Sequence, residues 1–486
     1  MFDREDPKNI WVSPESIDGS GSYDRPYSSL KEALDQVQPG NTIILKNGSY
    51  TGDVTIQVSG SARAPIRILP DDGATVEIHN SCWFFYDTSD FVVSGFTFRN
   101  APSGAISIIG ECKRNRFDSL QFIDCGSRKD ASCTMFFGGS GGEFNVVDNC
   151  RFQRSADNEN KLSSPENASI GLMISQGDGD DSKRLRNCIF RQNHFINYGY
   201  GIMVGSGDSN DSQYGHVVEY NTVENCISEG IVVKCGDTQI RGNLVMNCPG
   251  KSITVLAGTG SMIEDNRILD CGSGIAVNGQ GHTISNNCLI RCGREAVRVC
   301  AKSNGNSSPA SSLFIESNTF IECGSAATEA KPRVAGITIE PGTTCAVRRN
   351  LVYGEGEVFY IVKSISYRDN LENIEISTPA QYVIQDNAAS GQCREAEGFS
   401  TIAVEFSTPE SGNYENQSGY GASGWMMRSE GFDPHMDDIA EEDDYLDPDS
   451  FEDDDGELII PGETNQSDLF SRYFEMDESQ TIADEG

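Results

Sequence analysis

The sequence has no run of eighteen apolar residues, so it predicts no transmembrane helix. Its opening residues, MFDREDPKNIWVSP, lack the basic stretch and apolar core of a secretory signal. Proline is scarce, with 17 residues in 486, whereas glycine numbers 50, which indicates frequent turns rather than collagen or a proline-rich linker. With 37% hydrophobic residues, a chain of this length can bury a sizeable core.

Basic residues are few, 37 against 73 acidic, and the formal net charge is -36. A chain this acidic is repelled by nucleic acids, so we expect no nucleic-acid partner. The charge is uneven, because the last 57 residues, 430–486, carry a net -21. We predict that this segment is a disordered acidic tail and that the rest of the chain is only moderately acidic.

Signatures of common active sites are also missing. No CxxC pair occurs among the 16 cysteines, and the closest two, Cys288 and Cys292, have no second pair to complete a zinc site. No Walker loop, dinucleotide fingerprint or Ser/His/Asp array stands out, and there are only five histidines.

The cysteines instead mark a repeat. Five segments begin with asparagine and end with cysteine: NTVENC (Asn221–Cys226), NLVMNC (Asn243–Cys248), NRILDC (Asn266–Cys271), NCLIRC (Asn287–Cys292) and NTFIEC (Asn318–Cys323). The steps between their cysteines are 22, 23, 21 and 31 residues, and a short strand such as GIVV or GIAV follows each cysteine. Two short strands per period of about 22 residues predict an all-β solenoid, a single right-handed parallel β-helix.

Stacking of such coils accounts for the recurring residue types. In each I-x-V strand we expect the isoleucine and valine to face inward and the middle residue outward. We expect the recurring asparagine to adopt the left-handed conformation at a corner and to hydrogen-bond the next coil, forming a ladder. The cysteine is interpreted as a small buried hydrophobe; the alternative is disulfides, which would imply an oxidising compartment.

The pattern divides the chain into four parts. Residues 1–41 hold a strand and a helix at Tyr27–Val37 that caps the solenoid, residues 42–362 form the coils, residues 363–429 form irregular coils and a cap, and residues 430–486 form the tail. A capping helix would cover apolar interior and strand edges that otherwise invite aggregation.

The cap and coil segments Asp24–Tyr50, Ala64–Ile78 and Phe91–Asn100 resemble right-handed parallel β-helix proteins, and among them polysaccharide lyase family 6, the chondroitinase B and alginate lyase group. This resemblance covers roughly residues 8–355. It implies a carbohydrate-active protein that cleaves uronic-acid polysaccharide by β-elimination, in an extracellular or periplasmic location, although no signal peptide is visible.

The resemblance also implies site residues. The family has an Asn-Gly-Gly-Glu run, then an acidic pair, a lysine five residues on, and an Arg-His-Gly one coil later. The matching stretches here are NYGYGIMVG from Asn197 and EGIVVK from Glu229, so Asn197 and Glu229 resemble Ca²⁺ ligands and Lys234 resembles the catalytic base. The alternatives are an ion-paired carboxylate for Glu229 and a solvated strand-end lysine for Lys234.

The sequence departs from the family at several of these positions. Tyr200 and Met203 replace the family's glutamate and arginine, Ile227 replaces the second acidic ligand, and Val255, Leu256 or Ala257 replaces the arginine and histidine. Because β-elimination needs a cation to offset the enolate charge, these losses remove working parts of the family's mechanism and leave enzyme status open.

Three other cations are candidates for the site. Lys251 and Arg267 are candidates for a further acid or for substrate binding, and Arg298, about 14 Å from Lys234, is a candidate for binding another sugar unit. An acidic turn at Gly177–Asp181 could hold calcium or be a solvated loop, and GFDPHMDD (Gly431–Asp438) resembles a motif of mannuronan C5-epimerases but begins the tail.

We therefore expect a monomeric β-helix protein whose partner is an acidic polysaccharide or other glycan. The leading function is a lyase with Ca²⁺ as cofactor. The alternative is a non-catalytic glycan-binding, structural or adhesive β-helix protein.

Overall fold

The structure is a computed structural model that describes most of the chain. The described residues are 2–126, 133–138, 141–155, 169–175, 185–205, 214–301, 309–326, 333–369, 372–394, 396–404, 406–408, 413–416 and 420–422. The predicted acidic tail, the acidic turn at 177–181 and the GFDPHMDD segment lie outside them.

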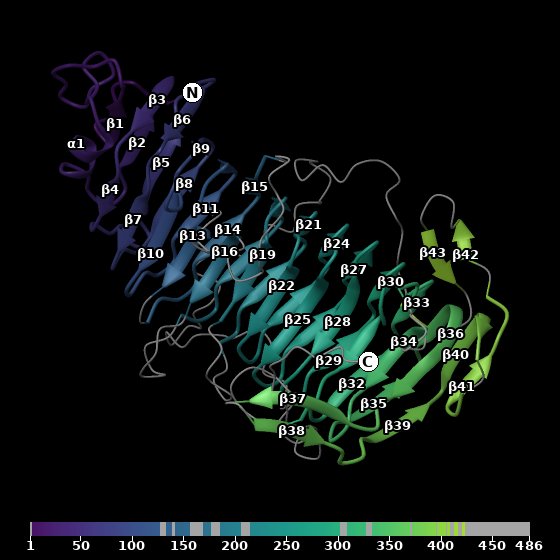
Figure 1. The fold of residues 1–486 in the computed structure, drawn as a ribbon. Coiled ribbons are helices and arrows are strands. Elements are labelled where there is room, and N and C mark those ends of the chain that lie inside the picture. Colours follow the sequence, from purple (N-terminus) through teal and green to yellow (C-terminus); the bar gives the residue numbers. More distant parts are fainter. Residues whose placement is uncertain are drawn as a thin grey trace.

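Three columns of stacked parallel strands, here called sheets A, B and C, form the walls of a solenoid (Figure 1). Each coil contributes one strand to each sheet, and every strand pairs in parallel with its counterparts in the neighbouring coils. The predicted all-β parallel solenoid is confirmed.

The strands of sheet A, in stacking order, are β1 (Asn9–Val12), β2 (Thr42–Leu45), β5 (Ile66–Pro70), β8 (Phe91–Ser94), β11 (Arg116–Asp118), β14 (Val146–Asp148), β17 (Ile189–Arg191), β20 (Val217–Glu219), β23 (Gln239–Arg241), β26 (Met262–Glu264), β29 (Thr283–Ser285), β32 (Leu313–Glu316), β35 (Thr344–Arg348) and β39 (Gln381–Gln385).

The strands of sheet B are β3 (Gly48–Thr51), β6 (Val76–His79), β9 (Thr97–Arg99), β12 (Gln121–Ile123), β15 (Arg151–Gln153), β18 (His194–Ile196), β21 (Thr222–Glu224), β24 (Leu244–Met246), β27 (Arg267–Leu269), β30 (Cys288–Ile290), β33 (Thr319–Ile321), the first half of β36 (Leu351–Ile361), β40 (Asn387–Cys393) and β41 (Phe399–Thr401).

The strands of sheet C are β4 (Val54–Ile56), β7 (Trp83–Tyr86), β10 (Ile106–Ile109), β13 (Cys133–Gly138), β16 (Ile170–Ser175), β19 (Tyr200–Val204), β22 (Glu229–Lys234), β25 (Lys251–Ala257), β28 (Ser273–Val277), β31 (Val297–Val299), β34 (Val334–Ile339) and the second half of β36.

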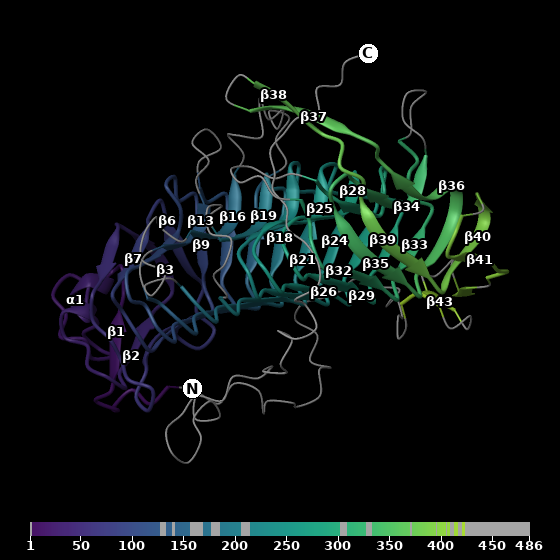
Figure 2. The ribbon, with the colours of Figure 1, turned by 90° about the horizontal axis from the view of Figure 1, so that it is seen from below.

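Two antiparallel hairpins lie outside this stack. They are β37 (Ile365–Asp369) with β38 (Glu372–Ile376), and β42 (Phe406–Thr408) with β43 (Asn413–Asn416). Figure 2 shows the β37–β38 hairpin projecting away from the coils.

The stacked strands extend past the predicted range of 42–362 at both ends. Strand β1 pairs with β2, and β39, β40 and β41 continue sheets A and B. The helix α1 (Leu30–Leu34) is shorter than the predicted Tyr27–Val37 and lies at the N-terminal end of the stack (Figure 1). Ser29 caps it by accepting a hydrogen bond from the Glu32 amide, and Leu30, Ala33 and Leu34 are buried in the main core.

The asparagine ladder exists, but its residues do not adopt the left-handed conformation predicted for them. The positive φ angles belong to the residue just before a ladder asparagine, such as Asn286 at 53° beside Asn287, and to the residue just before a cysteine, such as Asn247 at 56° beside Cys248. The reason is that two residues share the corner: the first has the positive φ angle that turns the chain, and the second points its side chain into the stack of coils. The ladder comprises Asn193, Asn221, Asn243, Asn266, Asn287, Asn318, Asn350 and Asn387, each donating to the next.

All sixteen cysteines are free thiols, and thirteen of them are buried. Hydrogen bonds between thiols of neighbouring coils, together with burial, raise the pKa values of Cys248, Cys271 and Cys292. These thiols are therefore neutral at physiological pH and pack as small hydrophobes. The interpretation of the cysteines as buried repeat residues is confirmed over the disulfide alternative.

Candidate functional site

Sheet C is the wall whose strands are joined to the rest of the coil by the longest connections, and it is therefore the candidate wall for a functional site. The links from sheet A to sheet B are mostly two residues, as between β14 and β15. By contrast, the link from β15 into β16 spans residues 154–169, and the link out of β19 spans residues 205–216. Insertions thus accumulate on both sides of sheet C, and loops placed on a rigid scaffold are where binding residues concentrate.

The outer face of sheet C presents side chains in register from coil to coil. On β22, Ile231 and Val233 belong to the interior core, whereas Val232 and Lys234 face outward by alternation. Glu229, at the start of the strand, is partly exposed and reaches Lys251 of the next coil. Val232 lies beside Thr254 of β25, and Thr254 lies beside Ala276 of β28. The predicted inward and outward alternation of the I-x-V strands is confirmed.

Lys234 stands at an irregularity in this face. Val233 lies opposite Val255, but Lys234 lies opposite Ala257, so Leu256 is an extra residue that forms a β-bulge. Bulges turn side chains locally and are frequent beside active sites. Lys234 is half-buried, and no ion pair joins it to another residue in the described ranges.

Glu229 is already paired with a cation of the next coil. The Nζ of Lys251 lies 3.3 Å from the Oε1 of Glu229. Burial, followed by the charge of Glu229, raises the pKa of the neighbouring Tyr200. The ion-paired interpretation of Glu229 is therefore the one that this contact supports.

The two residues predicted to bind calcium are not brought together by the strand register. Glu229 lies opposite Tyr200, whereas Asn197 sits at the preceding corner with φ 62° and donates its amide to the Arg154 carbonyl at 2.9 Å. Calcium takes six to eight oxygen ligands, and two side chains at different places, one of them ion-paired, do not fit that requirement.

The same register separates the predicted metal ligands from the predicted base. Glu229 begins β22 and Lys234 ends it, so five steps of extended chain, about 16 Å, lie between them. Among the described residues, no group of three or more His, Cys, Asp or Glu side chains could hold a metal ion. Calcium remains a prediction, and no chemical step is derived through it.

Arg298 faces outward on sheet C but is held by two carboxylates. Its guanidinium hydrogen-bonds Glu340 at 2.7 Å and lies 3.6 Å from Glu295. Burial alone would lower the pKa of Arg298, but Glu340 and Glu295 outweigh burial and raise it. Binding a sugar carboxylate would require Arg298 to leave this cluster.

Arg267 lies on a different wall. It occupies β27 of sheet B, where Ile268 faces the core and Arg267 faces outward. It therefore does not share the face of Lys234, although the sequence spacing made it a candidate for the same site. Of the predicted residues, Glu229, Lys234, Lys251 and Arg298 all lie on strands of sheet C, although Glu229 and Lys234 are at opposite ends of β22.

Two further polar residues were not identified from the sequence: Thr254 on β25, and Asn278, which directly follows β28. Thr254 and Asn278 are each about 1% exposed, and the Thr254 hydroxyl and both polar atoms of the Asn278 amide have no hydrogen-bond partner among the residues that the structure describes. Buried polar groups normally have partners, so these atoms are available to a ligand or water. The signal in the sequence was the polar middle residue of Ile253-Thr254-Val255, which faces outward by alternation.

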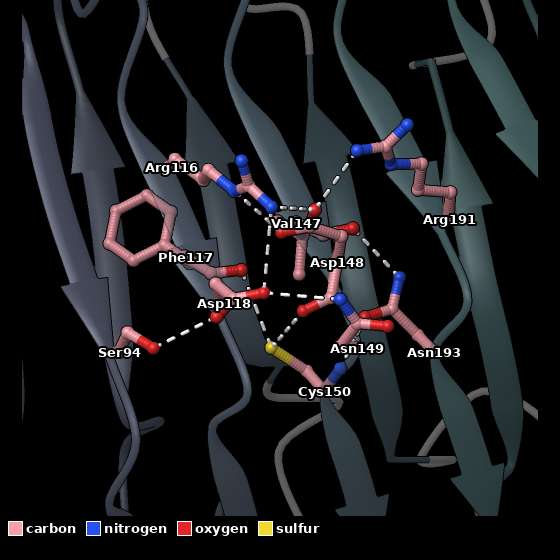
Figure 3. Close-up of polar contacts among 10 residues, drawn as sticks. All are labelled: Ser94, Arg116, Phe117, Asp118, Val147, Asp148, Asn149, Cys150, Arg191 and Asn193. Atoms are coloured by element: carbon pink, nitrogen blue, oxygen red, sulfur yellow. Dashed lines mark hydrogen bonds and ion pairs between the residues drawn. The ribbon is translucent and has the colours of Figure 1, made fainter. Parts of the chain in front are cut away.

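A second cluster of charges lies on sheet A and is structural. Figure 3 shows the fully buried Asp148 between Arg116 and Arg191, whose guanidinium nitrogens lie 2.8 and 3.3 Å from its Oδ2. Asp118 accepts hydrogen bonds from Ser94 and Asn149 beside it. These contacts join four successive coils, from β8 to β17. The carboxylates of Asp118 and Asp148 already accept hydrogen bonds or ion pairs from the protein itself, which indicates a structural role.

Comparison with known proteins agrees with this architecture. Residues 176–352 match the family model described as a right handed beta helix region. The structure is similar to the PL6 family alginate lyase AlyGC, with a TM-score of 0.62 and 18% identity over 88% of this chain and 58% of that one. It is also similar to a mannuronic acid specific polysaccharide family 6 lyase from human gut microbiota, with a TM-score of 0.59 and 18% identity over 83% of this chain and 92% of that one.

A curated relative matches a shorter segment. Pectate lyase PEL9 of Emericella nidulans is 41% identical over 73 residues, which are 14% of this chain and 18% of that protein. The chain thus spans less than a fifth of that relative, and just over half of AlyGC. No helix within the described residues is long and apolar enough to cross a membrane. The chain is a right-handed parallel β-helix protein whose fold resembles that of polysaccharide lyase family 6.

Proposed function

We propose that this protein is carbohydrate-active, that it binds an acidic polysaccharide along the outer face of sheet C, and that Lys234 is the base of a β-elimination. The observation that carries the proposal is the position of Lys234 at the β-bulge of β22 and β25, on the wall flanked by the long connections. The resemblance to family 6 lyases and to a pectate lyase supports the substrate class.

The proposed reaction starts from a uronate unit lying against Lys234. A neutral Lys234 amine takes the proton from C5, the C5–H electron pair forms the C4–C5 double bond, and the C4–O bond breaks. The departing oxygen takes a proton and becomes the new chain end. The products are a shortened chain and a chain with an unsaturated terminal sugar.

A matched pair of lysine variants tests this role. Wild type, Lys234→Gln and Lys31→Gln would be incubated with alginate, chondroitin and pectate, and the absorbance of the unsaturated product followed. Lys31 lies on α1 and is exposed, so its loss controls for the loss of one charge. We expect activity on at least one polymer, lost at least 100-fold in Lys234→Gln and kept in Lys31→Gln. Equal activity of the two variants would remove Lys234 from the mechanism.

Calcium as cofactor is proposed separately from the base. If Asn197 and Glu229 take part in a calcium site, isothermal titration calorimetry of the metal alone will detect binding that Glu229→Gln weakens at least tenfold. Identical titrations for wild type and Glu229→Gln would exclude this ligand.

A non-catalytic glycan-binding protein is the second candidate, and two observations favour it. Lys251 and Arg298, the other predicted cations of sheet C, are each paired with a carboxylate, which opposes their use to offset an enolate charge. In addition, the unpartnered atoms of Thr254 and Asn278 can receive sugar hydroxyls without any chemistry. Binding that Asn278→Ala weakens, with no product from any polymer, would establish this candidate over the lyase.

A further inference from the structure

The outer face of sheet B changes character along the solenoid. In the early coils it is polar: Glu77 pairs with His79 and Arg99, and farther along His194 pairs with Glu224. From β24 to β36 it is mainly apolar, with Arg267 of β27 and Thr319 of β33 as polar exceptions. The outward-facing residues there form what we call the apolar stripe, made of Leu244, Met246, Leu269, Cys288, Ile290, Ile321 and Tyr353.

The stripe is distinct from the interior core. Ile268, Leu289 and Phe320 alternate with its members and face the core, so the stripe lies on the outside of a single-layer wall. Even so, Leu269, Cys288, Ile290 and Ile321 are only 9, 3, 1 and 2% exposed. Such low exposure of apolar side chains on an outer face favours an additional layer over them.

The chain itself reaches this face near its C-terminal end. The Gly421 amide donates to the Arg349 carbonyl at 2.8 Å, and the Ala422 amide donates to the Thr319 hydroxyl of β33 at 2.8 Å. Arg349 precedes β36, so from Gly421 to Ala422 the chain moves from the coil of β36 to the coil of β33. This direction leads toward β30 and β27, which carry the centre of the stripe.

The residues that follow have the composition to cover it. After Ala422 the sequence reads Ser423, Gly424 and then Trp425-Met426-Met427. Three extended residues span about 10 Å, or roughly two spacings between neighbouring strands, so β30 and β27 are within reach of Trp425. Met427 can reach β24, because five residues span about 17 Å. Trp and Met supply large apolar area and adapt to irregular surfaces.

We propose that residues 425–427 dock on the apolar stripe and form a second layer over sheet B, anchored by the hydrogen bonds of Gly421 and Ala422. The occupant is this chain's own C-terminal segment rather than a second copy, because the segment starts on the stripe and is tethered within reach of it. Docking here would also place the origin of the acidic segment 430–486 at sheet B and not at sheet C.

Fluorescence of Trp425 tests the proposal in the full chain. Its emission is obtained as the difference between wild type and Trp425→Phe, since the other two tryptophans, Trp11 and Trp83, are buried. We expect Trp425 to emit as a buried indole that acrylamide quenches weakly. Ile290→Asp in the stripe should shift that emission to the red and increase quenching.

A control variant places the same charge elsewhere. Val383→Asp, at a half-exposed position of sheet A, should leave the Trp425 emission unchanged. Solvent-like Trp425 emission in wild type, or no response to Ile290→Asp, would overturn the proposal. Emission that changes on dilution would assign the cover to a second copy and also overturn it.

Labelling of Cys288 supplies a measurement that does not depend on a charged variant in the stripe. Cys288 lies in the stripe, whereas Cys292, four residues on, belongs to the interior core. Replacing Trp425, Met426 and Met427 by alanine should make Cys288 react at least tenfold faster with a thiol reagent, as followed by peptide mass spectrometry, while Cys292 stays protected. Unchanged protection of Cys288 in this variant would reject the docking.

Discussion

The side-chain oxygen of Asn287 accepts two hydrogen bonds from Asn266, one from the backbone amide and one from the side-chain amide, each 3.0 Å long. Asn287 in turn donates its own amide to Asn318 and to two backbone carbonyls. A single fully buried residue therefore satisfies groups in three successive coils. Its neighbour Asn286 has φ 53°, turns the chain, and makes an exposed side-chain hydrogen bond to Asp265.

This division predicts opposite outcomes for the same substitution at adjacent positions. Asn287→Gly removes every one of these bonds and leaves buried amide groups unpaired, so we expect the free energy of unfolding to fall by about 3 kcal/mol or more. Asn286→Gly places glycine where φ is positive and should change it by less than about 1 kcal/mol. Urea unfolding of both variants checks this, and equal losses would contradict the separation of turning and ladder residues.

Removing Arg116 should cost more stability than removing its partner Asp148. Asp148 is fully buried, whereas Arg116 is 43% exposed and can be solvated without its partner. We expect Arg116→Gln to lower the free energy of unfolding by about 3 kcal/mol and Asp148→Asn by about 1 kcal/mol, measured in urea at neutral pH.

The pH dependence of Arg116→Gln gives a further check on that cluster. Burial, opposed by Arg116, raises the pKa of Asp148. A carboxyl with a raised pKa in the folded state stabilises the fold at pH below its ordinary value and loses that contribution as the pH rises. Loss of Arg116 strengthens the effect, so the deficit of the variant should shrink as the pH falls toward 4. A deficit that stays constant would argue against a buried, poorly compensated carboxylate.

Two buried histidines predict a loss of stability in mild acid. Burial lowers the pKa of His216 to about 3 and that of His282 to about 4. Both are neutral in the folded state, and each Nδ1 accepts a backbone amide hydrogen bond, from Cys188 and Ser261 respectively. Because the unfolded chain takes up protons below about pH 6.5, stability is fully present above that pH and falls below it, by up to about 1.4 kcal/mol per pH unit for each histidine.

His216→Asn isolates one of these histidines. Asparagine keeps an acceptor at this corner: two coils earlier, Asn145 holds the same corner position and its side-chain oxygen accepts the Asn115 backbone amide. We expect the variant to show a shallower decline of the unfolding midpoint between pH 6.5 and 4 than wild type. Superimposable pH profiles would show that His216 does not contribute.

The thiols predict a simple count. Sixteen thiols should react with a chromogenic thiol reagent after unfolding without reductant, because all sixteen cysteines are free. In the folded protein only the partly exposed Cys133, Cys300 and Cys393 should react readily. Fewer than sixteen thiols after unfolding would restore the disulfide interpretation.

Much of the fold could be predicted from the spacing of Asn and Cys. The repeat from Asn221 to Cys323 predicted the coil period, and the I-x-V strands predicted which side chains face the core, because a strand alternates its side chains regardless of context. The left-handed corner residue was misassigned by one position, since Asn favours both a positive φ and a side-chain ladder and the sequence does not show which role wins.

The candidate site was less predictable. Asn197 and Glu229 were expected to bind one calcium ion together. The strand register instead places them at different points of the coil, and Glu229 forms an ion pair with Lys251. Arg267 and Arg298 both looked available for substrate, but one lies on sheet B and the other is held by Glu340. Nucleic-acid exclusion, the monomeric state and the divisions of the chain stay predictions.

The sequence alone determined that this chain coils into a parallel β-solenoid, because period, strand alternation and recurrent corner residues are local properties that repeat. Only the tertiary structure decided which outward side chains meet, because a contact between coils depends on register and on bulges such as the one at Leu256. The single extra residue Leu256 shifts the partner of Lys234 to Ala257. No periodic pattern in the sequence predicts this bulge.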